Sequence, residues 1–263
     1  MKKDLQKYKN NIYSQWGEDG ILEELLRRLG IFNYEDIWVV EFGAWDGKHL
    51  SNTFNLIKKG ANSVLIEGDT TRYSDLLETR KQYKKINPIN AFVSDNGENS
   101  LDNLLSKTPI RSDYEILSID VDSYENLAIW KNYKGNPKIV IIEINSSFLP
   151  YEKNIDNALG NTFFDTNKVG EEKGYKLVAH TPNMIFVKTK EIEKIYTNLR
   201  YKSHQLYDYI IFLKWRNISR LKTINYLFKN FNKVSIIAML IKLLPQKAML
   251  FLIEKFYQKE SPT

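Results

Sequence analysis

The chain has 263 residues, of which 43% are hydrophobic and 27% charged, which is ordinary for a globular protein. It contains no cysteine and three histidines, which excludes a disulfide framework, a thiolate zinc site, a thiol nucleophile and a histidine-rich metal site. The first residues lack the apolar core of a secretory signal, and no apolar run is long enough to span a membrane. We therefore expect a cytoplasmic protein.

The net charge of +6 is unevenly distributed along the chain. Residues 190–263 carry 14 basic and 5 acidic side chains, a net charge of +9, and residues 1–189 carry 24 basic and 27 acidic side chains, a net charge of −3. This asymmetry predicts a mildly acidic domain at 1–189 and a basic helical extension at 190–263. It also argues against a protein whose whole surface binds nucleic acid.

The hydrophobic pattern predicts alternating helices and strands. In chain order we expect a helix at 21–32, a strand at 37–42, a helix at 50–60, a strand at 62–69, a helix at 74–83, a strand at 90–95, a helix at 100–107, a strand at 114–122, a helix at 125–133, a strand at 137–145 and a helix near 160–173. Residues 174–188 then predict two strands joined at a Thr-Pro-Asn turn.

This alternation predicts an α/β fold with a mainly parallel sheet covered by helices on both faces. The last two strands are joined by so short a turn that they must be antiparallel. Five alternating strands followed by one hairpin are the layout of the seven-stranded, Rossmann-like fold of class I S-adenosylmethionine (SAM) methyltransferases. In such sheets the ligand lies at the carboxyl ends of the strands.

The stretch VVEFGAWDGKHLSNT, residues 39–53, is the first candidate for a cofactor site. Gly43 allows a sharp turn off the strand, and Gly47 opens the next helix, whose amides favour an anionic group. The GxGxxG pattern of dinucleotide sites is absent. Asp46 would repel a pyrophosphate and suit the ammonium group of SAM, which favours SAM over NAD. Alternatively, both glycines only let a helix pack on a strand.

The ends of the next two strands extend the candidate site. Glu67, in VLIEGD, follows the loop by about 20 residues, a position at which an acid accepts hydrogen bonds from ribose hydroxyls. Ser94 and Asp95 end the third predicted strand, where they could meet an adenine amino group. The alternatives are a solvated strand end for Glu67 and a helix-capping turn for Ser94 and Asp95.

Five motifs together resemble the FkbM-type SAM-dependent methyltransferases, in the branch with an N-terminal SQxGEDG box: YSQWGEDGIL (13–22), VVEFGAWDGKHLSNT, LIEGD, LSIDVDSYENLAIW (117–130) and KIVIIEIN. The resemblance covers about residues 12–188. It implies methyl transfer from SAM to a hydroxyl group, often on a sugar. It places the cofactor loop on Glu41, Gly43 and Gly47 and the ribose acid on Glu67. The Asp-x-Glu-Gly pattern usual in the family is replaced here by Asp120-Val121-Asp122-Ser123.

Four side chains are candidates for removing a proton from the acceptor: Asp120, Asp122, Glu143 and His180. Asp120 and Asp122 share one face of an extended strand, and Glu143 ends the neighbouring strand. These three carboxylates could also hold Mg²⁺ or Mn²⁺, which prefer oxygen ligands. The alternatives are that the acids only cap the sheet or bind hydroxyls directly, and that His180 is structural.

The box SQWGED (14–19) precedes the first helix, and in the resemblance it could bring Gln15 near the SAM carboxylate. Its alternative is a helix cap at Ser14 with solvated Gln15, Glu18 and Asp19. The full set of predicted cofactor contacts is Gln15, Glu41, Gly43, Ala44, Asp46, Gly47, Glu67, Gly68, Ser94 and Asp95.

The basic extension contains two aromatic or apolar segments rich in lysine and arginine, 207–228 and 233–256. Each predicts either a helix lying in an anionic membrane interface or a buried cap or dimer contact. Our leading hypothesis is a SAM-dependent O-methyltransferase acting on a nucleotide-sugar or a capsule or lipopolysaccharide precursor. The alternatives are a non-catalytic Rossmann-like protein that delivers the basic extension to a membrane or partner, and an NAD-binding oxidoreductase.

Overall fold

The computed structural model describes residues 4–121, 125–153, 160–196, 202–208 and 211–212. The chain divides into two compact units, Met1–Tyr207 and Asp208–Thr263. The first unit extends beyond the predicted domain boundary at 189, and all but three residues of the second lie outside the described residues, including the whole predicted segment 233–256. Within the described part of the chain, no helix combines the length and apolar character needed to cross a membrane.

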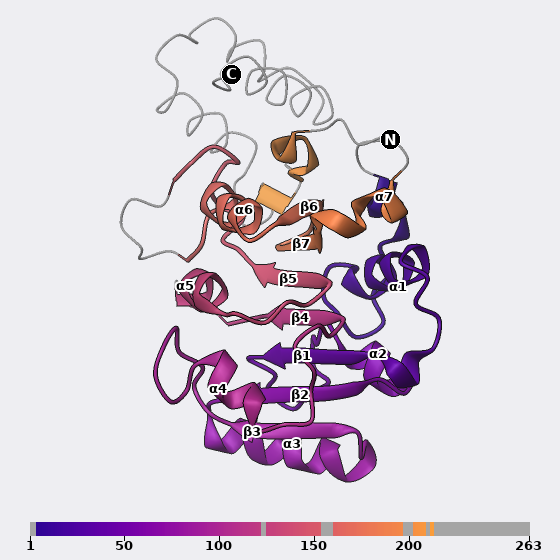
Figure 1. Ribbon diagram of the computed structural model, residues 1–263, viewed down its shortest axis with the longest axis vertical. Helices are drawn as coiled ribbons and strands as arrows, with labels where there is room; N and C mark the ends of the chain where they lie inside the picture. Colours follow the sequence, from indigo (N-terminus) through magenta and orange to yellow (C-terminus); the bar gives the residue numbers. More distant parts are fainter. Residues whose placement is uncertain (1–3, 122–124, 154–159, 197–201, 209–210, 213–263) are drawn as a thin grey trace, which may run out of the picture. The chain divides into compact units, whose positions relative to one another are not determined.

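One seven-stranded sheet forms the centre of the first unit, with the order β3-β2-β1-β4-β5-β7-β6 (Figure 1). The strands are β1 Trp38–Phe42, β2 Asn62–Glu67, β3 Ile86–Asn90, β4 Ile116–Ile119, β5 Ile139–Glu143, β6 Tyr175–His180 and β7 Asn183–Lys188. β1 to β5 are parallel, and β7 runs antiparallel to both of its neighbours, β5 and β6. This topology confirms the predicted fold of class I SAM-dependent methyltransferases.

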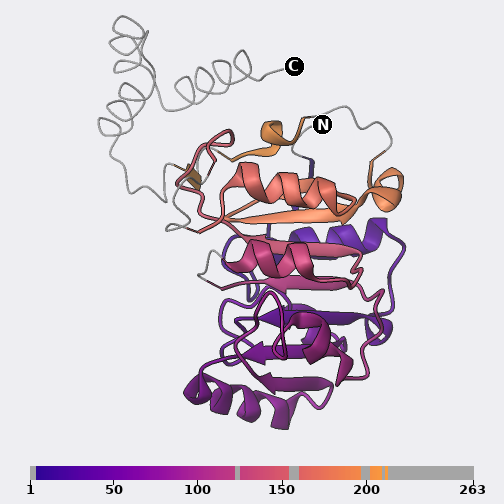
Figure 2. The same ribbon diagram turned by 60° about the vertical axis from the view of Figure 1, so that its left-hand side comes forward.

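Helices cover both faces of the sheet (Figures 1 and 2). α4 Leu101–Ser106, α5 Glu125–Asn132 and α6 Phe163–Glu172 lie on one face, where Trp130 of α5 packs against Phe186 of β7 at 5.1 Å between ring centroids. α1 Glu18–Arg28, α2 Phe54–Lys58, α3 Thr70–Gln82 and α7 Ile192–Ile195 share a second core, which includes Leu25, Leu76 and Ile192. All strands except the edge strand β3 are buried along nearly their whole length, as predicted for a sheet covered on both faces.

Two predicted elements were misplaced. The third strand is Ile86–Asn90, so it ends where the predicted strand at 90–95 begins. It contains Pro88, which an edge strand such as β3 tolerates because proline needs no donor on the open side. The predicted helix at 50–60 is only Phe54–Lys58. Its first residues do not continue the helix because Leu50 has a left-handed φ of 56° and residues 51–53 bind Glu41 instead.

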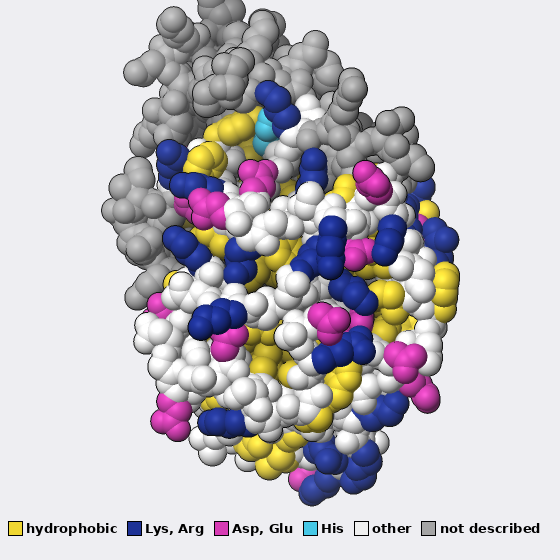
Figure 3. Space-filling view, viewed as in Figure 1, with side chains coloured by type: hydrophobic (Ala, Val, Ile, Leu, Met, Phe, Trp, Pro, Cys, Tyr) yellow, Lys and Arg dark blue, Asp and Glu magenta, His cyan; other side chains and the backbone are white. Residues whose placement is uncertain are grey.

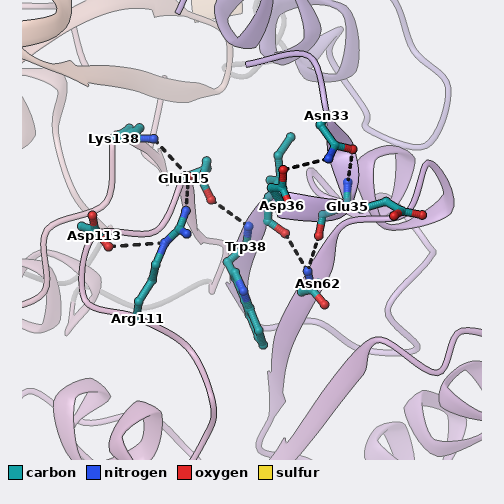
Figure 4. A network of polar contacts seen from close by, with 10 residues as sticks. Asn33, Glu35, Asp36, Trp38, Asn62, Arg111, Asp113, Glu115 and Lys138 are labelled. Atoms are coloured by element: carbon teal, nitrogen blue, oxygen red, sulfur yellow. Dashed lines mark hydrogen bonds and ion pairs between the residues drawn. The ribbon is translucent and has the colours of Figure 1, made fainter. Parts of the chain in front are cut away.

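At the amino ends of the strands, Glu115 joins three elements (Figure 4). Its carboxylate accepts hydrogen bonds from the backbone N–H of Trp38 at 2.8 Å, from Arg111 at 2.7 Å and from Lys138 at 3.1 Å. The side chain is almost fully buried. These contacts hold the starts of β1, β4 and β5 together at the edge of the sheet opposite to the strand ends that carry the predicted site.

The face of the molecule that Figure 3 shows has mixed charge. On it, the Lys and Arg side chains of the described residues are interspersed with Asp and Glu side chains. Mixed charge favours solubility and gives this face no single sign of potential.

Candidate functional site

The segments that leave the carboxyl ends of β1, β2 and β4 meet at one edge of the sheet. The loop 43–53 follows β1, residues 67–69 end β2 and precede α3, and Asp120 follows β4. The crevice outside the carboxyl ends is where open α/β sheets bind ligands. The glycines, acids and aromatic side chains of these segments therefore define the candidate site.

Two glycines of the loop 43–53 are required by close contacts. Gly43 has φ 79°, and a Cβ atom there would lie 1.9 Å from the carbonyl oxygen of Asp120. Gly47 has φ 76°, and a Cβ atom there would lie 2.8 Å from Leu76 and 2.9 Å from Leu65. A side chain at either position would force the loop away from the sheet. Gly43 thus allows the loop to lie against the end of β4, and Gly47 allows it to pack against β2 and α3.

The carboxylate of Glu67 is fixed by backbone donors at the end of β2. Its Oε2 accepts from the N–H of Trp45 at 2.8 Å, and its Oε1 accepts from the N–H of Asp69 at 2.8 Å. Glu67 is 6% exposed. Each carboxylate oxygen can accept more than one hydrogen bond, so this anchored group still has capacity for hydroxyl donors.

Two exposed aromatic side chains flank Glu67. Trp45, from the loop after β1, is 40% exposed and holds a left-handed φ of 45°, while the guanidinium of Arg72 lies 4.8 Å from its ring centroid. Phe92, from the segment after β3, is 73% exposed. Its ring lies against Gly68, where an added Cβ atom would be only 2.3 Å away. Left-handed backbone at a non-glycine residue is a costly arrangement that often marks a functional site.

The hydrophobic pattern of the sequence did not indicate Phe92 as a site residue. Residues 90–95 were predicted as a strand, in which Phe92 would have been buried in the sheet. The available signal was Gly68, directly after the predicted ribose acid, because a glycine at a strand end leaves room for an aromatic ring from a neighbouring segment.

Glu41, a predicted cofactor residue on β1, holds the loop 43–53 in place through three hydrogen bonds. It is 2% exposed, and its carboxylate accepts from Ser51 Oγ at 2.6 Å, Thr53 Oγ1 at 2.5 Å and the N–H of Asn52 at 3.0 Å. Burial raises the pKa of Glu41, and the bonds from Ser51 and Thr53 act in the opposite direction. Three donors from consecutive residues explain why the chain does not become helical before Phe54.

Asp46, which we predicted to meet the SAM ammonium group, closes the turn in the same loop. Its Oδ1 accepts from the N–H of Lys48 at 2.8 Å and of His49 at 2.7 Å. The carboxylate is half-buried. Its bonds to two successive amides are the usual way in which an aspartate stabilises a turn.

The carboxylates predicted for the acceptor side are only partly described. Asp120 is half-buried, and its Oδ2 accepts from the side-chain amide of Asn52 at 3.3 Å. Glu143 is half-buried at the end of β5, in register with Asn183. Asp122 lies outside the described residues. In the part of the chain that the structure describes, no three acidic or histidine side chains form a group suited to a metal ion, and we derive no step through Mg²⁺ or Mn²⁺.

His180 is 0% exposed, which argues against its predicted role as a general base. Its ring is stacked on Tyr207 at 4.7 Å and 14°, with Phe163 edge-on at 5.4 Å. Its Nε2 lies 3.4 Å from Ser146 Oγ. A general base has to reach the proton that it removes. His180 is enclosed because Tyr207, which donates a hydrogen bond to Phe148 O at 2.6 Å, covers it.

Ser94 and Asp95 lie in a turn before α4. Ser94 Oγ donates to Asn96 O at 2.7 Å. Asp95 accepts from the side-chain amide of Asn96 at 2.8 Å and lies 3.4 Å from the amide of Asn132, on α5. Ser100 is the N-cap of α4, with its hydroxyl accepting from the N–H of Asn103 at 3.4 Å. Predicted contacts of Ser94 and Asp95 with adenine remain predictions.

Glu18 and Asp19 of the SQWGED box are buried at the start of α1, so the alternative in which they are solvated does not hold. Asp19 is 1% exposed, and its Oδ2 accepts from three successive N–H groups at 2.7–2.8 Å, those of Ile12, Tyr13 and Ser14. Glu18 is 0% exposed and accepts from the N–H of Trp16, from Thr181 Oγ1 and from the amide of Asn183.

The box also touches the loop 43–53. Ser14 forms an isolated parallel bridge with Leu50, and Gln15, the next residue, is exposed. The bridge brings the segment before α1 to the loop that follows β1, so Gln15 lies beside this loop. Its predicted contact with the SAM carboxylate stays a prediction.

Comparison with solved structures finds several similar chains. The chain is similar to M. capricolum TrmK in complex with S-adenosyl-homocysteine (12% identity, TM-score 0.47, covering 83% of this chain and 91% of that one). It is also similar to the CMeT domain of the citrinin polyketide synthase (12%, 0.45, 65% and 50%) and to the CurJ carbon methyltransferase (12%, 0.46, 70% and 56%). The chain spans about half the length of the last two. With TM-scores below 0.5, these three likenesses carry no conclusion about this chain.

No protein-family model and no curated protein sequence matches the chain. The resemblance to FkbM-type methyltransferases therefore rests on the motifs alone.

Proposed function

We propose that this chain is a SAM-dependent methyltransferase that modifies a hydroxyl group. The observation that carries the proposal is the anchored carboxylate of Glu67 between the exposed rings of Trp45 and Phe92 at the carboxyl edge of the sheet. A nucleoside presents two hydroxyls and one flat base, which fit a carboxylate acceptor and an aromatic platform respectively. The loop at Gly43 lacks the glycine pattern of a dinucleotide site.

When bound, SAM supplies an electrophilic methyl group on a sulfonium sulfur. In the proposed site Glu67 accepts hydrogen bonds from the ribose hydroxyls and Phe92 stacks on the adenine. Asp120, which follows β4, would take the proton of the acceptor hydroxyl, while the hydroxyl oxygen would bond to the methyl carbon and the carbon–sulfur bond of SAM would break. The products are a methyl ether, S-adenosylhomocysteine and a protonated carboxyl. A positioned base contributes about 100- to 10,000-fold to such a step.

Calorimetry with S-adenosylhomocysteine and with NAD⁺ tests the cofactor part of the proposal. We expect binding of S-adenosylhomocysteine and none of NAD⁺. Glu67→Ala should weaken S-adenosylhomocysteine binding by about 1–3 kcal/mol, because ribose hydroxyls lose a charged partner. Asp75→Ala is a control that removes an exposed carboxylate on α3, outside the segments of the site. No binding to the folded wild type would overturn the proposal and leave a non-catalytic protein, and unchanged affinity of a folded Glu67→Ala variant would remove Glu67 from the site.

A sugar hydroxyl is the acceptor that we propose, on a nucleotide-sugar or a precursor of capsule or lipopolysaccharide. This part rests on the resemblance to FkbM-type methyltransferases and on the oxygen-rich strand ends at Asp120 and Glu143. Transfer of radiolabelled methyl from SAM to a panel of nucleotide-sugars tests it. Label that is found in RNA or protein, and not in any saccharide, would contradict the proposed acceptor while leaving methyl transfer intact.

A further inference from the structure

A buried polar chain connects β1, the loop 43–53 and the end of β4. Asn52 is its central member and is 2% exposed. Its backbone N–H donates to Glu41 Oε1 at 3.0 Å, and its side-chain Nδ2 donates to Ser118 Oγ at 3.1 Å and to Asp120 Oδ2 at 3.3 Å. One residue therefore contacts acids of two neighbouring strands through two different groups.

The two contacts of Asn52 are chemically separable. The bond to Glu41 uses the backbone, so it survives replacement of the side chain, and Glu41 also keeps its bonds from Ser51 and Thr53. The bond to Asp120 uses the side-chain amide, so replacement removes it. A side-chain substitution thus changes the environment of Asp120 and leaves the anchor of the loop in place.

We infer that Asn52 is a positioning residue, which orients the carboxylate of Asp120 and ties it to the loop 43–53. This inference rests on the proposed function, because it assigns a purpose to Asp120 in proton removal. Glu41 fixes the loop, the loop fixes the amide of Asn52, and the amide restrains one oxygen of Asp120. A hydrogen bond from a buried amide holds a partly buried carboxylate in one rotamer, and misplacing a reacting group by about 1 Å can cost about 100-fold in rate.

The test compares Asn52→Ala with two matched variants. Asn55→Ala removes another buried asparagine amide, which donates to Glu23. Asn55 is not a member of the polar chain that contains Asp120. Ser118→Ala removes the second acceptor of the Asn52 amide and leaves its bond to Asp120. Each variant is measured for its melting temperature, S-adenosylhomocysteine affinity, and the kcat and acceptor KM of methyl transfer.

We expect Asn52→Ala to lower kcat at least tenfold while the affinity for S-adenosylhomocysteine changes less than threefold. Asn55→Ala should lose comparable stability with kcat within about twofold of wild type, and Ser118→Ala should retain most of the turnover. A folded Asn52→Ala enzyme with wild-type kcat would overturn the inference. An equal fall of kcat in Asn55→Ala would overturn it too, because the loss would then follow stability.

A second measurement does not depend on activity or on the folding of Asn52→Ala. The side-chain amide resonances of Asn52 are compared by NMR between wild type and Asp120→Asn. We expect them to shift, because the acceptor of one N–H changes from a carboxylate to an amide. Unshifted resonances would show that the bond to Asp120 is absent and would overturn the inference. A wild type that binds no S-adenosylhomocysteine while these resonances do shift would be a failure of the proposed function instead.

Discussion

Phe92 is the single residue whose position most changes the description of the site. Its ring is 73% exposed and lies against Gly68, next to the anchored carboxylate of Glu67. An exposed aromatic ring in water has no partner on its outer face, and stacking of a base on such a ring contributes about 1–3 kcal/mol. Phe92 thereby gives the proposed site a second exposed aromatic ring, in addition to that of Trp45 in the loop 43–53.

We predict that Phe92→Ala weakens S-adenosylhomocysteine binding by about 1–3 kcal/mol, because the base loses its stacking partner. The chain offers a matched control in Phe32, which is 72% exposed and follows α1. Phe32→Ala should leave the affinity unchanged. Calorimetry of both variants makes the measurement, and equal affinities would exclude Phe92 from the site.

At the scale of elements, α1 is fixed by its N-terminal box. Glu18 links the start of α1 to the turn between β6 and β7 through Thr181 and Asn183. Replacing it by alanine leaves buried donors unpaired, each of which costs about 1–3 kcal/mol. We expect Glu18→Ala to lower the free energy of unfolding by at least that amount in chemical denaturation.

Glu78, on α3, is the control for this prediction. Its side chain is 69% exposed and pairs with Lys81. Exposed ion pairs contribute about 0–1 kcal/mol, so Glu78→Ala should have a small effect. Comparable losses in both variants would contradict the anchoring function that we assign to Glu18.

The same helix predicts a pH dependence. Hydrogen bonds from Arg27, opposed by burial and supported by Arg28, lower the pKa of Glu24 from 4.5 to about 2. The folded state therefore binds fewer protons than the unfolded state between these values. The stabilisation is present above pH 4.5 and is lost as pH falls towards 2.

Unfolding of wild type and Glu24→Gln at pH 7 and pH 3 tests this dependence. We expect the variant to be less stable at pH 7, with the difference between the two proteins smaller at pH 3, because the unfolded wild type then carries a proton on Glu24 that folding has to release. A difference of the same size at both values would show that the charge of Glu24 does not stabilise α1. Comparing the two proteins at each pH cancels the titration of the other carboxylates.

On the scale of the whole molecule, the segment after β7 completes the first unit. Ile192 and Ile195 belong to the same core as α1, and Tyr207 covers His180. All three are at most 6% exposed. Burial of a large apolar side chain contributes about 1.5–3 kcal/mol, so the three together approach the stability of a typical domain.

We predict different results from two truncations. A chain ending at 207 should unfold cooperatively and bind S-adenosylhomocysteine like the full chain, because it keeps these contacts. A chain ending at 190 should have a melting temperature at least 10 °C lower or fail to fold, because the core that faces α1 opens. Thermal unfolding by circular dichroism distinguishes them, and equal stability would place the boundary at 189, as the charge distribution predicts.

Local sequence determined the architecture and part of the site. The alternation of apolar strands and helices fixed the parallel sheet, because parallel strands need helical connections, and the short turn at Thr181–Asn183 fixed the antiparallel hairpin. Glu67 and Asp120 were located because a strand end is visible in a hydrophobic pattern.

Contacts between distant residues were decided only by the tertiary structure. The alternative of a solvated Glu18 does not hold, because Thr181 and Asn183 lie against its buried carboxylate. His180 was a candidate base with a structural role as the alternative, and the structure encloses it under Tyr207. Phe92 was placed in a strand, although pairing of β3 with β2 ends at Asn90. Burial, register and hydrogen-bond partners depend on which segments meet in space, and hydrophobic periodicity reports only how each segment faces the core.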